Sequence, residues 1–242
     1  ASDYSLGTNN FFNVVIDAGV DPKFDNSAGS DVSIADNFTN SNTGLNTGAN
    51  ATFRFNGTGT QTITSASTGA NTTFGNLVVN KVSGSAVLAS IVHTAGTLTI
   101  TSGTFDLATF NSSAGAVTLT SGTIAGTTGI LTGTSYAVQS GTISAILAGA
   151  SALTKTTAGT VTLSGVNTYT GVTTINAGVL SVGTIGNGGV AGNLGAANNG
   201  SANLILGGGT LQYTGSTAST DRNYRLTAAT TSTIDVTSGG TT

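Results

Sequence analysis

The sequence predicts an all-β fold, a right-handed parallel β-helix (β-solenoid) with about 19 residues in each coil. Three observations predict this fold: a composition that favours short strands, glycine-led segments of alternating apolar residues, and a fixed interval between those segments. The alternative is a sandwich of short antiparallel strands, which also has regular turns. Such a sandwich does not normally keep one fixed step over several glycines in succession.

The composition favours many short strands joined by tight turns. The chain has 36 Gly against a single Pro, and it contains no Glu and no Cys. Charged residues make up 6% of the chain, far below the roughly 25% that is usual in soluble domains. Helix formers are therefore scarce, and we expect little or no helix. The absence of Cys excludes disulfides and thiolate metal sites.

The period comes from two series of glycines that lie seven residues apart. One series steps by 19 from Gly96 to Gly115, and the other steps by 19, 19, 18 and 19 through Gly103, Gly122, Gly141, Gly159 and Gly178. About 19 residues make two or three short strands and return the chain to its starting angle, so the next coil lies one strand spacing further along. The crossover rule for parallel strands makes the hand right. About twelve coils of ~4.8 Å would give a rod roughly 60 Å long.

Alternation within each segment separates the core from the surface. Val161 and Leu163 are predicted to point inward, in phase with the pairs Leu98 and Ile100, and Val117 and Leu119, while Thr160, Thr162 and Ser164 point outward.

The same period stacks Thr99 on Thr118, Thr101 on Thr120, and Thr104 on Thr123 and Thr142. Flat threonine columns suit ice binding, but the first column ends at Ala137 and Gln139. We therefore expect a role in packing and solubility, with ice binding as a weaker alternative.

A single β-solenoid is expected over residues 1–242. Residues 1–73 are expected to form less regular coils, a cap or an assembly end, because six of the nine Phe and six of the nine Asp lie before residue 56. Residues 74–242 are expected to form regular coils with a loop insertion at 186–201, where glycine-rich sequence lengthens one step to 31. Since the chain reaches residue 242 in mid-coil, we expect a longer protein or an end that something else completes.

No catalytic, cofactor-binding or metal site is predicted, and we do not expect an enzyme. His93 is the only His, and with no Asp near it in sequence it is expected to be structural. Polysaccharide lyases and hydrolases built on this fold need clustered Asp with Lys or Arg on one face. The coils from 96 to 178 offer only Asp106 and Lys155 for such a cluster.

An aspartate-rich segment near the N-terminus is the one candidate for a cation. It contains Asp17, Asp21, Asp25, Asp31 and Asp36. Carboxylate oxygens suit Ca²⁺, but this spacing matches neither the EF-hand loop nor the glycine-rich calcium repeat. We expect these side chains to cap turns, with Ca²⁺ binding as the weaker alternative.

The charge balance limits the partners. A net charge of −3 gives no basic surface for nucleic acid or for anionic lipid. No apolar run reaches the ~20 residues of a membrane-spanning helix, so membrane insertion of this segment is not expected. The expected partners are other copies of the chain, joined end to end or side by side, or other surface proteins and glycans.

The stretch "LTKTTAGTVTLSGVNTYTGVTTINAGVLSVG", residues 153–183, resembles the autotransporter-associated β-strand repeat. That repeat occurs in the passenger regions of bacterial type V secretion proteins and in other very large bacterial surface proteins. The resemblance rests on the opening Leu153 to Lys155, on the first strand with Gly159 and Leu163, on the turn 167–171, and on the second strand with Ile175 and Gly178. It implies export, a right-handed β-helix, and a structural or adhesive role outside the cell.

These observations predict a non-catalytic structural or adhesive segment on a bacterial surface, which joins end to end into a fibre in its sharper form. The alternative is a module that binds glycans or matrix through a projecting loop at 186–201. A polysaccharide lyase or hydrolase and an ice-binding protein are the weaker alternatives.

Overall fold

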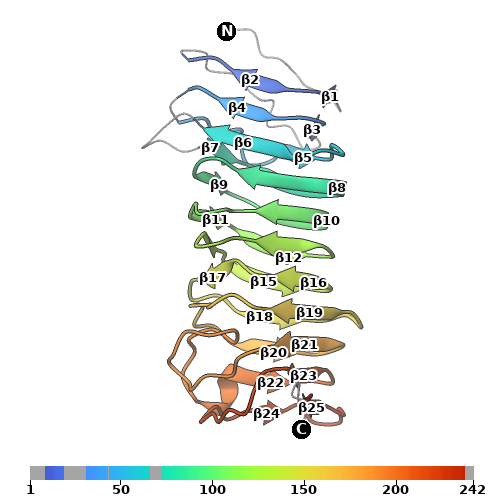
Figure 1. Ribbon diagram of the computed structural model, residues 1–242, viewed down its shortest axis with the longest axis vertical. Helices are drawn as coiled ribbons and strands as arrows, with labels where there is room; N and C mark the ends of the chain where they lie inside the picture. The colour runs from blue at the N-terminus through green and yellow to red at the C-terminus, as the bar shows by residue number, and fades with distance from the viewer. Residues whose placement is uncertain (1–8, 19–30, 43, 66–71, 238–242) are drawn as a thin grey trace.

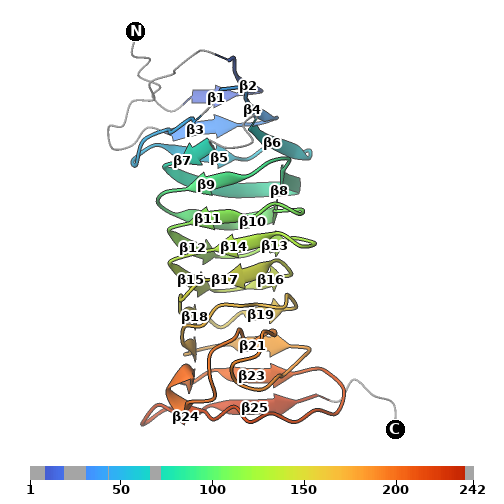
Figure 2. The same cartoon turned by 90° about the vertical axis from the view of Figure 1, so that its left-hand side faces the viewer.

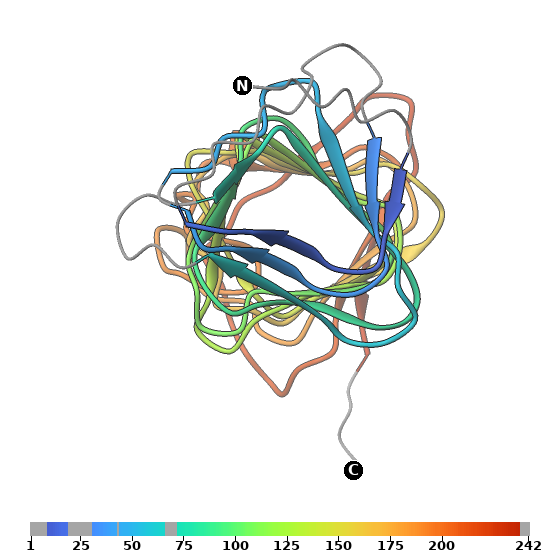
Figure 3. The same cartoon turned by 90° about the horizontal axis from the view of Figure 1, so that it is seen from above.

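A computed structural model, which describes residues 9–18, 31–42, 44–65 and 72–237, shows a parallel β-solenoid (Figure 1). The chain winds from the blue N-terminal strands to the red C-terminal strands, with successive turns stacked along one axis. Strands that neighbour one another in the ladders run parallel. Seen from the N-terminal end, the chain turns clockwise as it recedes, so the solenoid is right-handed (Figure 3). The predicted fold is confirmed.

The stack has three sides, and two of them run its whole described length (Figures 1 and 2). The first side is the ladder β1 (Asn9–Phe11), β3 (Asp31–Ile34), β5 (Thr52–Phe55), β8 (Asn76–Leu88), β10 (Leu98–Asp106), β12 (Ala116–Leu119), β15 (Ser135–Val138), β18 (Leu153–Lys155), β20 (Thr173–Ile175), β22 (Leu204–Leu206) and β24 (Arg225–Leu226). The second side is β2 (Val14–Ile16), β4 (Phe38–Asn40), β6 (Gln61–Ser65), the later parts of β8 and β10, β13 (Thr123–Ala125), β16 (Gly141–Ile143), β19 (Thr160–Leu163), β21 (Val179–Val182), β23 (Thr210–Tyr213) and β25 (Thr233–Val236).

The third side is a strand ladder only in the middle of the stack. It consists of β7 (Thr72–Phe74), β9 (Val92–Thr94), β11 (Ser112–Ala114), β14 (Ile130–Thr132) and β17 (Ile146–Ala148). Beyond β17 irregular segments close the turns on this side, among them the short 3₁₀ helix η1 (Ser201–Asn203). This replacement of strands by irregular segments on the third side is the main irregularity of the fold. The loop predicted at 186–201 is one of these segments.

Turn length changes along the stack. In the middle, Phe105 pairs with Ile124 and Ile124 with Ile143, which gives the predicted step of 19. Near the N-terminus Phe38 pairs with Ile63, a step of 25. Towards the other end Val182 pairs with Tyr213, a step of 31. The prediction of about twelve coils is therefore too high: the described ladders make about ten turns, because the turns at both ends are longer than 19 residues.

The glycine column holds as far as Gly141. A Cβ on Gly122 would lie 2.2 Å from the Gly103 carbonyl oxygen, and a Cβ on Gly141 would lie 2.1 Å from that of Gly122. Both residues have positive φ, +93° and +118°, so no other residue fits there without strain. The next step differs from the prediction, because Gly141 pairs with Val161 and not with Gly159. The corner from Lys155 to Val161 spans six positions, whereas the equivalent corner from Val138 to Gly141 spans three.

The core consists of side-chain columns parallel to the axis. One column runs through every turn of the first side: Phe11, Ile34, Phe55, Val79, Ile100, Leu119, Val138, Lys155, Ile175, Leu206 and Leu226. The inward residues predicted from the alternation, Leu98, Ile100, Val117, Leu119, Val161 and Leu163, are buried. The predicted columns of Thr99 with Thr118 and of Thr104 with Thr123 and Thr142 are also found, and Thr162 extends the second of them.

Candidate functional site

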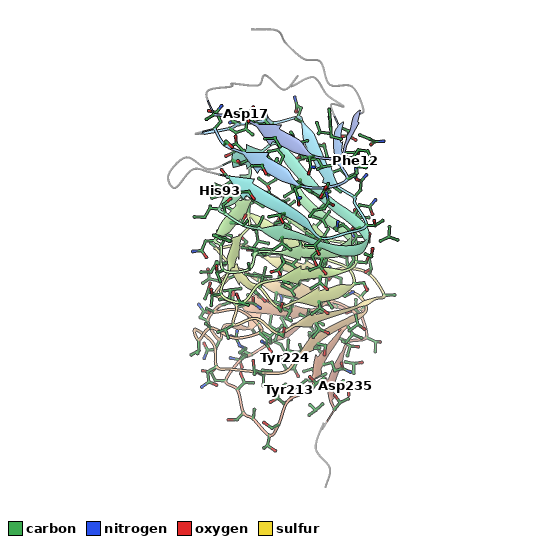
Figure 4. The ribbon with its side chains drawn as sticks, turned by 45° about the horizontal axis from the view of Figure 1, so that its top comes forward. Phe12, Asp17, His93, Tyr213, Tyr224 and Asp235 are labelled. Atoms are coloured by element: carbon green, nitrogen blue, oxygen red, sulfur yellow. The ribbon has the colours of Figure 1, made fainter. Side chains whose placement is uncertain are left out.

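The C-terminal end of the stack exposes the core columns. Leu226, Ile234 and Val236 continue the buried columns of the first and second sides, yet they are 59%, 47% and 67% exposed. Beside them lies a groove of about 330 Å³. Its lining is largely apolar and includes Ile185, Leu211, Tyr213, Ile234 and Val236. Figure 4 shows Tyr213 and Asp235 at this end of the rod. Side chains of the core type therefore meet solvent on an end face.

The N-terminal end has a smaller hollow and a partly covered core. The side chains of Phe11 and Val14 pack against the core but remain half-buried. Phe12, at the corner between β1 and β2, is 82% exposed, and Figure 4 places it at the rim of this end. A hollow of about 230 Å³ lies among Phe11 and Phe12, Ser33 and Ala35 of the next turn, and Asn56 of the turn after it.

The loop predicted to project at 186–201 is partly buried, because its middle part forms the third side of the solenoid in this turn. Asn193, Leu194 and Ala197 are buried, and the backbone NH of Ala196 donates to the Tyr169 carbonyl. The Asn193 side chain accepts from the NH groups of Gly183 and Thr184 and donates to the Gly165 carbonyl. This inner half replaces the missing strand of the third side, and the outer parts, 187–191 and 198–202, remain at the surface.

Arg222 binds this loop to the following turn. Its guanidinium donates to five carbonyl oxygens, those of Gly186, Asn187, Val190, Gly195 and Ala197. Burial lowers the pKa of Arg222, and the nearby Tyr169 and Asp221 oppose that shift. Burial also raises the pKa of Tyr169 to about 12. With five loop carbonyls as its acceptors, the arginine acts as a structural clamp.

Two lysines are buried in the core, which the sequence did not indicate. Lys81 is 1% exposed, and its ammonium donates to the Gly57 carbonyl and to Gln61 Oε1, each at 2.6 Å. Lys155 is fully buried and donates to the carbonyls of Thr157 and Ala177, on successive turns. Burial lowers the pKa of both groups. Since these acceptors belong to corners of the coil, the two ammonium groups join neighbouring corners.

His93 lies on the outer face of the third side, beside a serine. The Ser113 hydroxyl lies 2.6 Å from His93 Nδ1, and the two residues are stacked in register on β11 and β9. This pair was not recognised in the sequence, although the 20 positions between the two residues correspond to one turn. Burial lowers the pKa of the His93 ring. A serine–histidine pair becomes a nucleophile only with oxyanion donors and a sheltered substrate site, and this pair lies on a ladder of half-exposed side chains.

The predicted aspartate cluster is only partly within the described residues. Asp21 and Asp25 lie outside them. Asp31 is 3.5 Å from Arg54, in a half-exposed ion pair, and Asp17 is exposed. The described ranges contain no group of three His, Cys, Asp or Glu side chains that would hold a metal ion. Calcium binding by the five aspartates stays an untested alternative.

Comparison with known proteins identifies one segment of the chain. Residues 153–182 match the family model described as passenger-associated-transport-repeat, which confirms the resemblance expected over 153–183. In the fold this segment runs from β18 to β21 and carries Lys155, Asn167 and Tyr169 inside. Searches of curated proteins and of solved structures gave no match.

A passenger-associated repeat implies a secreted or surface location. None of the helices in the described part of the chain has the length and hydropathy that crossing a bilayer requires. The repeat and the solenoid together suggest a structural segment of the autotransporter passenger type.

Proposed function

We propose that this chain is a non-catalytic structural segment of an exported bacterial surface protein, a rod that holds adhesive or recognition elements away from the cell. One observation carries the proposal: the core column from Phe11 to Leu226 passes through every turn without a break. Since each turn contacts only its neighbours, stability is spread along the axis, and no turn is expected to act as a hinge. In its sharper form, the rod associates with itself end to end.

Limited proteolysis tests the structural role. Only a chain that opens locally is cut, so a broad-specificity protease should remove surface loops and leave a resistant fragment that contains residues 72–182. Mass spectrometry of the digest identifies that fragment. Early cuts within β10 to β16 would contradict the proposal, because they would show that the middle of the rod opens on its own.

The Ser113–His93 pair offers a direct test of the non-catalytic part. The purified chain and the His93→Ala variant are incubated with a panel of esters and polysaccharides. We expect no release of product from either. Turnover by the unmodified chain that disappears in His93→Ala would overturn the proposal and identify the pair as a catalytic base and nucleophile.

A second candidate function is binding of glycans or matrix. It is favoured by the corner where Asn223 donates hydrogen bonds to the carbonyl of Asn199, in the outer loop segment 198–202, because the next residue, Tyr224, is 48% exposed. Neutral sugars stack on exposed aromatic rings and accept hydrogen bonds from amides. A glycan array with the unmodified chain and with Tyr224→Ala tests this function. Equal binding by both would reject this corner as the site.

A further inference from the structure

We propose that Asn187 is a self-modification site, at which the chain converts an asparagine into aspartate or isoaspartate without the help of an enzyme. The inference goes beyond the structural role proposed above and does not depend on it. The reacting atoms belong to the Asn187 side chain and to the backbone nitrogen of Gly188. Asp221, on the following turn of the solenoid, contacts both groups.

The sequence Asn–Gly gives this reaction the least steric hindrance, because glycine has no Cβ beside the nitrogen that attacks. The chain contains three such sequences, all within the described residues: Asn56–Gly57, Asn187–Gly188 and Asn199–Gly200. In two of them the glycine NH donates to a neutral side-chain oxygen, Gly57 to Gln61 Oε1 and Gly200 to Asn198 Oδ1. At Gly188 the acceptor is a carboxylate.

Asp221 supplies both groups that the first step requires. Its carboxylate oxygen Oδ1 accepts from the Gly188 NH at 2.7 Å, so a base lies against the proton that must be removed. Its backbone NH donates to Asn187 Oδ1 at 3.1 Å, and this oxygen becomes negative when the side-chain carbon is attacked. One residue therefore contacts the nucleophile and the developing oxyanion together.

The surrounding loop holds these groups in place. The Asp221 carboxylate also accepts from Asn199 Nδ2 at 3.4 Å, and the Arg222 guanidinium donates to the Asn187 carbonyl at 3.3 Å. A Cβ on Gly188 would lie 2.3 Å from the backbone nitrogen of Asn199, so the chain is closely packed at the reacting nitrogen. Because these contacts orient the groups before the reaction, the folded chain has already met much of the entropic cost of alignment.

The reaction releases ammonia and consumes water. Asp221 Oδ1 removes the proton from the Gly188 nitrogen, this nitrogen forms a bond to Asn187 Cγ, and the Cγ–Nδ2 bond breaks. The proton leaves with the amide group as ammonia, and a succinimide ring remains. Water then opens either carbonyl of the ring, which leaves aspartate or isoaspartate at position 187.

The product adds a charge to a surface that has very few. Within residues 82–220 the charged side chains are Asp106 and the buried Lys155. A new carboxylate at position 187 lies beside that of Asp221, and the two like charges repel. The isoaspartate product also lengthens the backbone by one carbon. Modification should therefore loosen the loop at 186–197 as the protein ages.

The test follows conversion at the three asparagines in the folded chain at neutral pH. Samples taken over weeks in water enriched in heavy oxygen are digested and mapped by mass spectrometry, and an isoaspartate-specific methylation assay identifies the isomer. The unmodified chain is compared with Asp221→Asn, which removes the base and keeps the shape of the side chain. Asp106→Asn is the matched control, because the Asp106 carboxylate also accepts from a backbone NH, that of Ala108, but in a sequence without Asn–Gly.

We expect Asn187 in the folded chain to convert at least about tenfold faster than Asn56 and Asn199. Asp221→Asn should slow the conversion of Asn187 at least about tenfold, and Asp106→Asn should leave it unchanged. Unfolding in urea separates Asp221 from Gly188, so the conversion of Asn187 should then fall to the rate of the other two sequences.

Two results would overturn the proposal: conversion of Asn187 that is no faster in the folded chain than in urea, or an equal rate in Asp221→Asn. If Asp221→Asn disturbs the loop, which hydrogen exchange of residues 186–197 would reveal, the comparison of the folded with the unfolded chain still decides. The structural role is tested separately, by the protease-resistant 72–182 fragment.

Discussion

At the scale of single residues, the polar groups that are buried or stacked maintain the register between turns. Lys155 stands in a column whose other members are apolar, and its ammonium is satisfied by two backbone carbonyls. A buried charge without such acceptors would be strongly destabilising. Ser113 and His93 form an equivalent contact on the outer surface. In both cases the partners lie on successive turns, so each contact favours one alignment of the coils.

The His93–Ser113 contact predicts a pH dependence of stability. Burial holds the pKa of folded His93 below its usual 6.5, so the folded state takes up the proton less readily than the unfolded state. The stability from this residue is therefore complete above pH 6.5 and is lost as the pH falls through the folded pKa. Thermal melts between pH 7.5 and 4.5 should show a larger fall in Tm for the unmodified chain than for His93→Gln. Equal falls in both proteins would contradict this account.

At the scale of the elements, the glycine column fixes how closely the corners of β10, β13 and β16 approach. The sequence predicted this column because no side chain fits where a corner touches the carbonyl of the turn before. It misplaced the step to Gly159, since glycine spacing does not reveal that the corner after Lys155 is longer. The structure of the third side beyond β17 was not predicted, for a similar reason. A glycine-rich insertion has no periodicity from which buried residues such as Asn193 and Leu194 could be recognised.

Gly122→Ala tests the corner contact. The new Cβ would lie 2.2 Å from the Gly103 carbonyl oxygen at a φ of +93°, so the ladder must shift or the backbone must strain. We expect the free energy of unfolding to fall by about 2 kcal/mol or more, measured by urea denaturation. Gly59→Ala, where an added Cβ meets nothing within 4 Å, is the control and should differ by less than about 0.5 kcal/mol. Equal stability of the two variants would show that the corner at Gly122 does not lie close against the Gly103 carbonyl.

Arg222→Met tests the clamp on the loop. Losing the five hydrogen bonds to the loop carbonyls should raise amide hydrogen exchange in residues 186–197 at least about tenfold, with little change in β10 to β16. Arg225→Met removes an exposed cation three positions away and serves as the control. Unchanged exchange in the Arg222 variant would show that the buried Asn193 and Leu194 hold the loop without the arginine.

At the scale of the whole molecule, the solenoid behaves as a one-dimensional array in which a turn can be removed without loss of the rest. Deleting residues 104–122 removes one complete turn and joins Gly103 to Thr123, which then pairs with Ser85 in place of Thr104. We expect this variant to stay folded, with the same far-ultraviolet circular dichroism per residue. Deleting only 104–112 breaks the register of every core column and should abolish cooperative melting. Unfolding of both variants to the same extent would argue against independent turns.

Much of this architecture follows from the sequence because stacking repeats one physical problem in every turn. Alternating Val161 and Leu163 specify the inward phase, and Gly103 to Gly141 specify the period, so fold and register in the middle of the rod could be predicted. The exposed columns at the ends could not, since Leu226 and Val236 look like core residues in sequence. Nor could the burial of Lys155, because a lysine gives no sign that carbonyls of two corners converge on it.

The most direct measurement of the stacked parallel coils is disulfide formation between cysteines introduced into a chain that has none of its own. Thr123 and Thr142 pair directly on neighbouring turns, about 4.8 Å apart, within the Cα range that a disulfide spans. Thr104 and Thr142 lie two turns apart, about 9.6 Å, beyond that range. Under mild oxidation, stacked parallel coils should give rapid, complete cross-linking within each chain for Thr123→Cys with Thr142→Cys, and none for Thr104→Cys with Thr142→Cys. Failure of the first pair to cross-link, or equal cross-linking of both pairs, would contradict this arrangement.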